Sequence, residues 1–156
     1  MTDEPADDFA NPLESIPAAG RIMALDLGTK TIGVAISDGM RYSATPLETI
    51  KRIKFTQDVE RILELVAQNQ IAAIILGLPL NMDGSEGPRV QSTRAFARNL
   101  AQKTALPIAF WDERLSTSAV TRMMIEADLR RDRRAEVVDK LAASYILQGA
   151  LDRLRR

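Results

Sequence analysis

Three carboxylates stand at positions where metal-dependent phosphodiester chemistry could use them. Asp26 lies near the end of the apolar segment 22–27, Glu113 follows the segment 107–112, and Asp139 lies among small residues with helical spacing. Two acids from strands and one from a helix can converge on one or two magnesium ions about 4 Å apart, which activates water and stabilises a leaving oxygen. Together they are candidate catalytic and metal-binding residues.

Each acid also has a structural interpretation that the residues alone leave open. Asp26 could accept hydrogen bonds from the turn at residues 28–30, and Asp139 could pair with an arginine or favour the positive end of its helix. Asp112 and Glu113 could form a loop pair beside the next helix, which is the favoured interpretation for Asp112. A charge on a packed helix face nevertheless needs a partner.

Two absences from the composition restrict the chemistry further. The 156 residues include no Cys and no His, so a thiolate nucleophile, a Cys-ligated zinc and an imidazole base are all excluded. Any catalysis must therefore rest on carboxylates, Lys, hydroxyls or metal-bound water. Hard oxygen ligands favour Mg²⁺ or Mn²⁺ as the cofactor.

Charge is unevenly distributed along the chain. Residues 1–20 contain five acids, three prolines and no Lys or Arg, which predicts a disordered acidic tail. Without these five acids, residues 21–156 hold 16 acidic and 21 basic residues, a formal charge of +5. This second segment is predicted to be one domain, and its charge is compatible with an anionic partner or with a solvated basic face.

No segment predicts insertion into a membrane. The longest apolar run, residues 71–78, is far shorter than the roughly 20 residues that span a bilayer, and the acidic start does not resemble a secretory signal. A cytoplasmic location with no membrane partner is expected.

The hydrophobic pattern predicts the elements that must position the acids. Alternation over residues 22–27 and 31–37 around a short turn predicts an antiparallel hairpin, and a third strand is expected over residues 45–50. Helical and strand patterns then alternate, in the order helix 55–66, strand 71–76, loop 81–88, helix 90–100, strand 107–111, helices 117–126 and 135–154. This order predicts an α/β fold, a mixed five-stranded sheet flanked by helices as in ribonuclease-H-like domains.

The expected elements bring the acids towards one end of the sheet. Ile22 and Ala24 share a strand face with Asp26. Glu113 follows a strand whose carboxyl end is expected to lie near Asp26, because ligands gather at the carboxyl ends of parallel strands. On the last helix, one face carries Asp139, Ala142, Ala143, Ile146 and Ala150, small residues that allow close packing on a sheet.

Basic and hydroxyl residues could contact phosphates. Thr29 and Lys30 offer donors in the glycine-containing turn. The basic runs at residues 51–54 and 130–134 fit either solvated loops or phosphate contacts.

At these residues the chain resembles the YqgF family, RuvC-like members of the ribonuclease-H superfamily described as Holliday-junction resolvases and pre-16S rRNA nucleases. Four blocks carry the resemblance: residues 24–38, 77–84, 112–117 and 139–148. The resemblance implies that Asp26, Glu113 and Asp139 bind the metal and that residues 77–87 border the substrate. One departure is Thr31, which stands where many members have Arg.

The implied activity is endonucleolytic cleavage of structured nucleic acid, with the 5′ end of pre-16S rRNA as the expected substrate in ribosome biogenesis. The candidate substrate contacts are Lys30, Asn81, Arg114, Ser116, Arg130, Arg131, Arg133 and Arg134. The expected partners are structured RNA or branched DNA, and the chain could act as a monomer or homodimer.

Three other functions remain open at this point. They are Holliday junction resolution in DNA recombination, a non-catalytic role as an RNA-binding ribosome assembly factor, and an actin-like ATPase half-domain. Only 4% of the residues are aromatic, which favours recognition of shape and backbone over base stacking.

Overall fold

The computed structural model describes residues 16–81, 83–115 and 131–155, and the side chains at 115 and 131–140 lie outside that description. Three strands, β1 (Arg21–Leu27), β2 (Thr31–Ser37) and β3 (Ala44–Lys51), come first. They are followed by α2 (Phe55–Asn69), β4 (Ile71–Leu78), α3 (Pro88–Ala101), β5 (Ile108–Asp112), the 3₁₀ turn η2 (Glu113–Leu115) and α5 (Arg131–Leu154).

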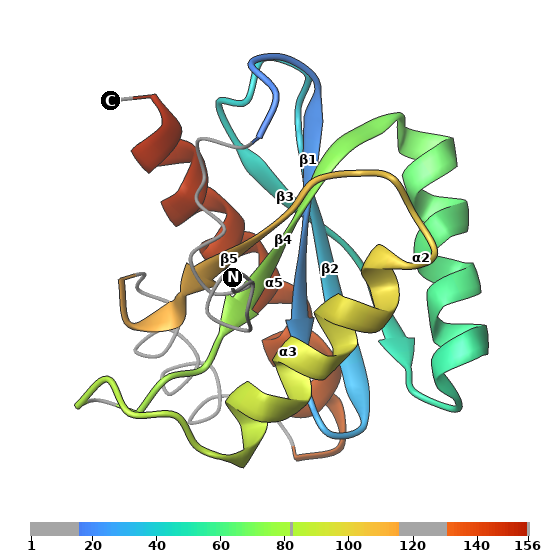
Figure 1. The fold of residues 1–156 in the computed structure, drawn as a ribbon, viewed down its shortest axis with the longest axis vertical. Helices are drawn as coiled ribbons and strands as arrows, with labels where there is room; N and C mark the ends of the chain where they lie inside the picture. Colours follow the sequence, from blue (N-terminus) through green and yellow to red (C-terminus); the bar gives the residue numbers. More distant parts are fainter. Residues whose placement is uncertain (1–15, 82, 116–130, 156) are drawn as a thin grey trace, which may run out of the picture.

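The five strands form one mixed sheet in the order β3-β2-β1-β4-β5 (Figure 1). β1, β2 and β3 pair antiparallel, because short turns join them. β4 pairs parallel to both β1 and β5, since α2 and α3 supply the crossovers that parallel strands need. The carboxyl ends of β1, β4 and β5 therefore lie at one edge of the sheet.

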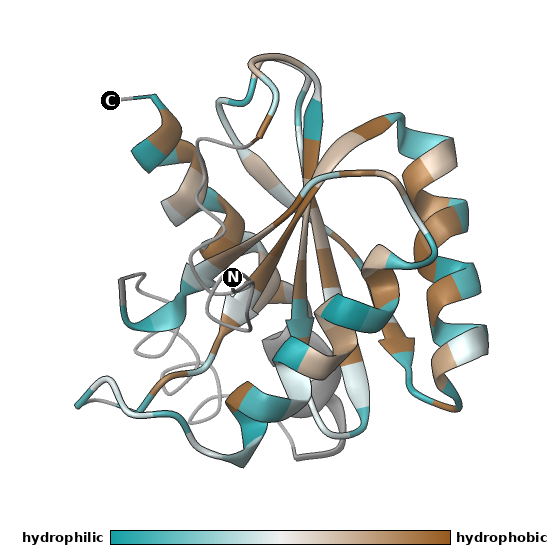
Figure 2. Ribbon diagram, viewed as in Figure 1, coloured by the Kyte–Doolittle hydropathy of each residue, from teal (hydrophilic) through white to brown (hydrophobic). Residues whose placement is uncertain are grey.

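Helices cover both faces of the sheet (Figure 1). α2 and α3 pack on the face that carries Met23, Leu25 and Leu27 of β1. α5 packs on the opposite face, which carries Ile22 and Ala24. Alternation along β1 thus fills two cores, and Figure 2 shows predominantly apolar central strands flanked by helices that carry both hydrophobic and hydrophilic residues.

The predicted α/β fold and the order of its described elements are confirmed. The helix expected over residues 117–126 lies outside the described residues. One boundary is corrected: α5 begins at Arg131, not at residue 135, so residues 131–134 are helical rather than a loop. None of the helices in the described ranges combines the length and apolar character needed to cross a bilayer.

The packed part of the chain extends further back than the first strand. Ile16 is buried in the core beneath α5. Gly20 has φ +104°, and a Cβ there would lie 2.7 Å from Cβ of Ala72, so this bend requires glycine. Arg41 Nε donates a 2.6 Å hydrogen bond to the Gly20 carbonyl.

Candidate functional site

Asp26 is a buried carboxylate in the middle of the sheet. It lies on central strand β1 opposite Gly33 of β2, and its residue is 1% exposed. Its side chain shares the α5 face with Ile22 and Ala24, as the sequence pattern predicted. A carboxylate at such a depth needs cations or hydrogen-bond donors around it.

Gly77 of β4 is where Glu113 reaches the same face. A Cβ built on Gly77 would lie 2.9 Å from Glu113 Oε2 and 3.2 Å from Glu113 Cγ, and 2.5 Å from Cδ1 of Ile146 in α5. The Glu113 side chain therefore crosses from η2 over β4, in a space that only a glycine leaves open.

The strand register brings Asp26 and Glu113 to one place. Leu25 pairs with Leu76, so the positions that follow, Asp26 and Gly77, are neighbours on adjacent strands, whose spacing is about 4.8 Å. Since Glu113 lies over Gly77, both carboxylates occupy the α5 face at the carboxyl end of the parallel strands.

The third expected acid, Asp139, belongs to the helix that covers this face. The backbone of α5 includes it, but its side chain is outside the described residues. Ala142, Ala143, Ile146 and Ala150 on the predicted packing face are all buried. Among the residues whose side chains are described, no group of three or more potential metal ligands occurs, so a complete three-acid site remains a prediction.

Asp112 is paired with Arg114, two residues further along the chain. Its carboxylate accepts bonds from the Arg114 backbone N–H at 2.9 Å and from Arg114 Nη2 at 2.7 Å. Burial tends to raise the pKa of Asp112, but the hydrogen bonds and the charge of Arg114 outweigh it, so this pKa lies below its usual value. Asp112 thus fixes the start of η2, from which Glu113 projects.

The segment between β4 and α3 is a folded loop beside the acids. The Asn81 carbonyl accepts the Gly84 N–H at 2.8 Å, and Asn81 Nδ2 donates to Ser85 Oγ at 3.0 Å. Gly84 has φ +88°, and the Arg114 guanidinium lies against it, with Nη1 3.4 Å from a Cβ built there. Asn81 and Arg114, two expected substrate contacts, therefore border the same loop.

An ion pair ties this loop to α3. Arg94, which is 5% exposed, pairs with Glu86, and Gln91 Nε2 also donates to Glu86 Oε1 at 3.0 Å. Burying a guanidinium is costly unless a carboxylate compensates it, so this pair restrains the end of the loop.

The other expected substrate contacts are described unevenly. Lys30 is exposed in the β1–β2 turn, and Thr31 is buried on the α5 face of β2. Ser116 and Arg130 lie outside the described residues. The backbone at Arg131, Arg133 and Arg134 forms the start of α5, with their side chains undescribed.

The acids brought together here are suitable ligands for a divalent metal. Asp26 and Glu113 supply oxygen donors from a buried strand and an adjacent turn, and Mg²⁺ and Mn²⁺ prefer carboxylate oxygen. The donor set therefore fits the expected cofactor.

Two supporting features escaped the sequence analysis. Gly77 interrupts the apolar run of β4, and a glycine inside a strand is a known signal of close approach by another group. The pairing of Arg94 with Glu86 had no comparable signal, because an arginine on an amphipathic helix is usually solvated.

Comparisons with known proteins agree with this architecture. The model of the RuvX family, also called YqgF and described as Holliday junction resolvase, matches residues 20–153. A Rhodobacter capsulatus protein is 64% identical over 148 residues, which cover 95% of this chain and 91% of that protein. A Paracoccus denitrificans protein is 59% identical over 155 residues, covering 99% and 96%. Both carry the name "Putative pre-16S rRNA nuclease".

A solved structure shares the fold at low identity. RuvC of T. thermophilus, in complex with a Holliday junction substrate, has a TM-score of 0.54 and 14% identity, with 87% of this chain and 96% of that chain covered. The fold that was predicted from the order of the strands is therefore also shared in the arrangement of the strands in space.

Proposed function

Because the chain belongs to the RuvX (YqgF) family, we propose that it is a metal-dependent endonuclease that cleaves structured RNA in the 5′ region of pre-16S rRNA. The names of its relatives favour this substrate. An rRNA substrate would also give the protein a cytoplasmic location.

The observation that carries the proposal is the approach of two carboxylates at the end of the sheet. Asp26 is buried on β1, and the Glu113 carboxylate lies over Gly77 on the adjacent strand. Two acids converging inside a small fold repel each other and lose hydration, a cost that a bound cation would offset. The two carboxylates are therefore proposed to form a cation-binding site.

Asp26, Glu113 and Asp139 are the residues that would hold the metal. Bound Mg²⁺ or Mn²⁺ would supply an activated water at neutral pH and charge stabilisation for the leaving oxygen.

The chain itself supplies rigidity and orientation. Asp26 is fixed by the central strand, whereas Glu113 reaches the site from a turn held by Asp112 and Arg114. Beside them, the loop ending at Glu86 and the turn containing Lys30 present polar groups on which a nucleic acid backbone could rest.

Holliday junction resolution is the second candidate, favoured by the description of the family model. A direct test would offer the protein a labelled RNA spanning the 5′ end of 16S rRNA and a four-way DNA junction, each with Mg²⁺, Mn²⁺ or chelator. We expect RNA cleavage with either metal and none in chelator, because the chain lacks Cys and His alternatives.

Glu113→Gln and Asp112→Asn form a matched pair for the same assay. Glu113→Gln should bind the RNA and fail to cut it, while Asp112→Asn should still cut. Cleavage that persists in excess chelator would refute the metal-dependent proposal. Tight binding without cleavage under every metal condition would favour a non-catalytic assembly factor.

A further inference from the structure

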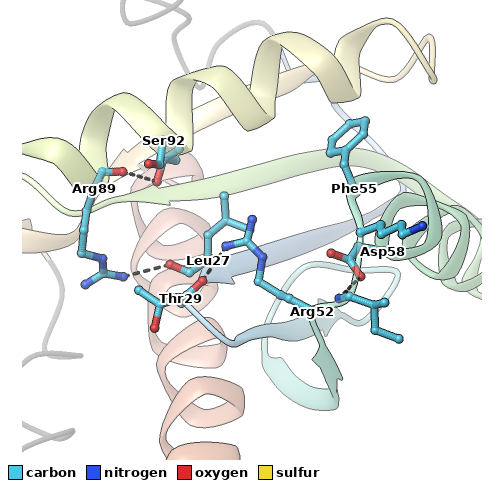
Figure 3. Close-up of a pocket in the computed structure, with 11 residues that line it drawn as sticks. Leu27, Thr29, Arg52, Phe55, Asp58, Arg89 and Ser92 are labelled. Carbon is cyan, nitrogen blue, oxygen red and sulfur yellow. Dashed lines mark hydrogen bonds between the residues drawn. The ribbon is translucent and has the colours of Figure 1, made fainter.

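A concave surface lies on the other side of the strand that carries Asp26. It has a volume of about 450 Å³ and lies between the end of β1, the segment after β3 and the start of α3. Figure 3 shows Arg52 and Arg89 reaching it from different elements, with Leu27 and Thr29 between them. We call this surface the basic cleft.

Cations outnumber acids in the lining of the basic cleft. Arg52, Lys54 and Arg89 line it together with one acid, Asp58. Asp58 Oδ1 accepts the Ile53 N–H at 3.1 Å. Within the described ranges, no carboxylate oxygen lies within 4 Å of the charged nitrogens of Arg52, Lys54 or Arg89. The cleft therefore carries an excess of positive charge.

Backbone carbonyls hold the two arginines in place. Arg89 Nη2 donates to the Leu27 carbonyl at 2.9 Å, and Arg52 Nη1 donates to the Gly28 carbonyl at 2.6 Å. A guanidinium carries five N–H donors, and a carbonyl does not neutralise its charge. Both groups are thus oriented without being discharged, and the Thr29 and Ser92 hydroxyls in the same lining add further donors.

We propose that the basic cleft binds a backbone phosphate of the nucleic acid whose cleavage is assigned to the acid site, and this proposal rests on the proposed function. Oriented guanidinium groups, an ammonium and hydroxyls are the groups that contact phosphates in nucleic acid complexes. The cleft is open and its cationic residues are exposed, so it suits a solvated backbone better than an enclosed nucleobase.

The position of the cleft explains how one strand could reach both sites. Asp26 faces α5, whereas Leu27 and Gly28, the next residues, hold the cleft arginines on the α2/α3 side. A nucleic acid strand that passes over the turn at residues 28–30 would meet the acids on one side of the turn and the basic cleft on the other. The cleft would then set the position of the cut by holding a phosphate at a fixed number of nucleotides from it.

Binding measured in chelator isolates this contact from cleavage. The probe is a labelled RNA hairpin with single-stranded flanks, titrated from about 50 to about 200 mM KCl. The variants are Lys54→Gln and Arg89→Gln, and the control is Lys103→Gln. Lys103 is an exposed cation beyond the other end of α3. Within the described residues, the Lys54 side chain makes no hydrogen bond or ion pair, so its substitution tests the cleft even if Arg89→Gln disturbs the fold.

Each cleft variant should weaken RNA binding by about fivefold at low salt, and the slope of log affinity against log salt should fall by about 0.7 for each lost phosphate contact. Lys103→Gln should bind like the parent. Equal binding by all three variants would overturn the proposal. Displacement of RNA from the parent by adenosine monophosphate, but not from the variants, would overturn it in favour of a mononucleotide pocket.

The cleavage assay separates this proposal from the proposed function. If the parent protein does not cut the RNA with metal, but the cleft variants still lose salt-dependent binding, the nuclease proposal fails and the cleft remains a phosphate site. If cleavage requires Glu113 but the cleft variants bind normally, the cleft proposal alone fails.

Discussion

The two sides of β1 differ sharply where the strand ends. On the α5 side, the buried Asp26 and the partly buried Glu113 lie on the face that carries Ile22 and Ala24, and Gly77 leaves room for the Glu113 side chain. On the α2/α3 side, Arg52 and Arg89 are exposed cations bordering an open cleft. Asp26 thus belongs to the acid side, whereas the next two residues, Leu27 and Gly28, bind the arginines of the basic cleft. The two groups of opposite charge lie on different sides of the sheet.

This difference implies different tolerances to change. A metal site depends on ligand positions within fractions of an ångström, so packing errors should affect it strongly. Phosphate contacts depend mainly on charge and tolerate displacement. Substitutions near the acids should therefore change cleavage more than binding, and substitutions in the basic cleft should do the reverse.

The largest effect is expected for Asp26→Asn. Cleavage should fall by at least about 100-fold, because a lost metal ligand removes several kcal/mol of transition-state stabilisation. In chelator, the melting temperature should match or exceed that of the parent, since one buried like charge is gone. Mg²⁺ or Mn²⁺ should raise the melting temperature of the parent far more than that of the variant.

Asp139→Asn should behave in the same way if its side chain completes the site. Thermal melts with chelator and with metal would test both variants. A loss of about 3–5 kcal/mol in chelator, with no metal-dependent difference, would instead identify a buried salt bridge.

Gly77→Ala should damage the acid side by packing alone. The new Cβ would displace Glu113 and Ile146, which should cost about 1–3 kcal/mol and reduce cleavage by about tenfold. The control is Gly39→Ala, because nothing lies within 4 Å of a Cβ at Gly39. Denaturant unfolding and cleavage rates would be measured for both, and equal cleavage by the two variants would contradict the role given to Gly77.

Glu86→Gln should loosen the loop between the two sides. We expect a loss of about 1–2 kcal/mol, because Arg94 is buried while Glu86 is partly exposed. Glu64→Gln is the control, since its pair with Arg61 is exposed and should contribute little. Denaturant unfolding would compare the two losses, and an equal loss would show that burial does not strengthen the Arg94 pair.

The smallest effect is expected for Asp112→Asn. At pH 7 the loss should be at most about 1 kcal/mol, because solvent screens this partly exposed pair. The folded-state pKa of Asp112 is lowered, so its stabilisation exists above the unfolded pKa and disappears as the pH falls through the folded value. Unfolding measured between about pH 7 and pH 3 should therefore show the parent and variant converging below about pH 4.

The sequence predicted the sheet well because its information is local. Alternation along β1 indicated which face carries Asp26, and small residues on the last helix indicated where it packs. The start of α5 could not be found in this way, since residues 131–134 have no apolar period, although Arg is a good helix former. A charged helical turn and a charged loop have the same composition.

Contacts across the fold were beyond the reach of sequence patterns. The hydrogen bond from Arg89 to Leu27 joins residues 62 positions apart, and the one from Arg52 to Gly28 spans 24 positions. Neither has a local signature, because any surface arginine could serve. The two arginines of the cleft become distinguishable only when the sheet brings them to the same strand end.

The order of the strands has a consequence for how the chain folds. β1, β2 and β3 meet through short loops, whereas Glu113 reaches Asp26 only after β5 docks beside β4. Since closing longer loops is slower, we expect pulsed hydrogen exchange to protect the amides of β1 and β2 before those of β5. The basic cleft is built from residues 27–93 alone. A nascent chain would then acquire the surface proposed to hold a phosphate before it brings together the two acids proposed to hold the metal.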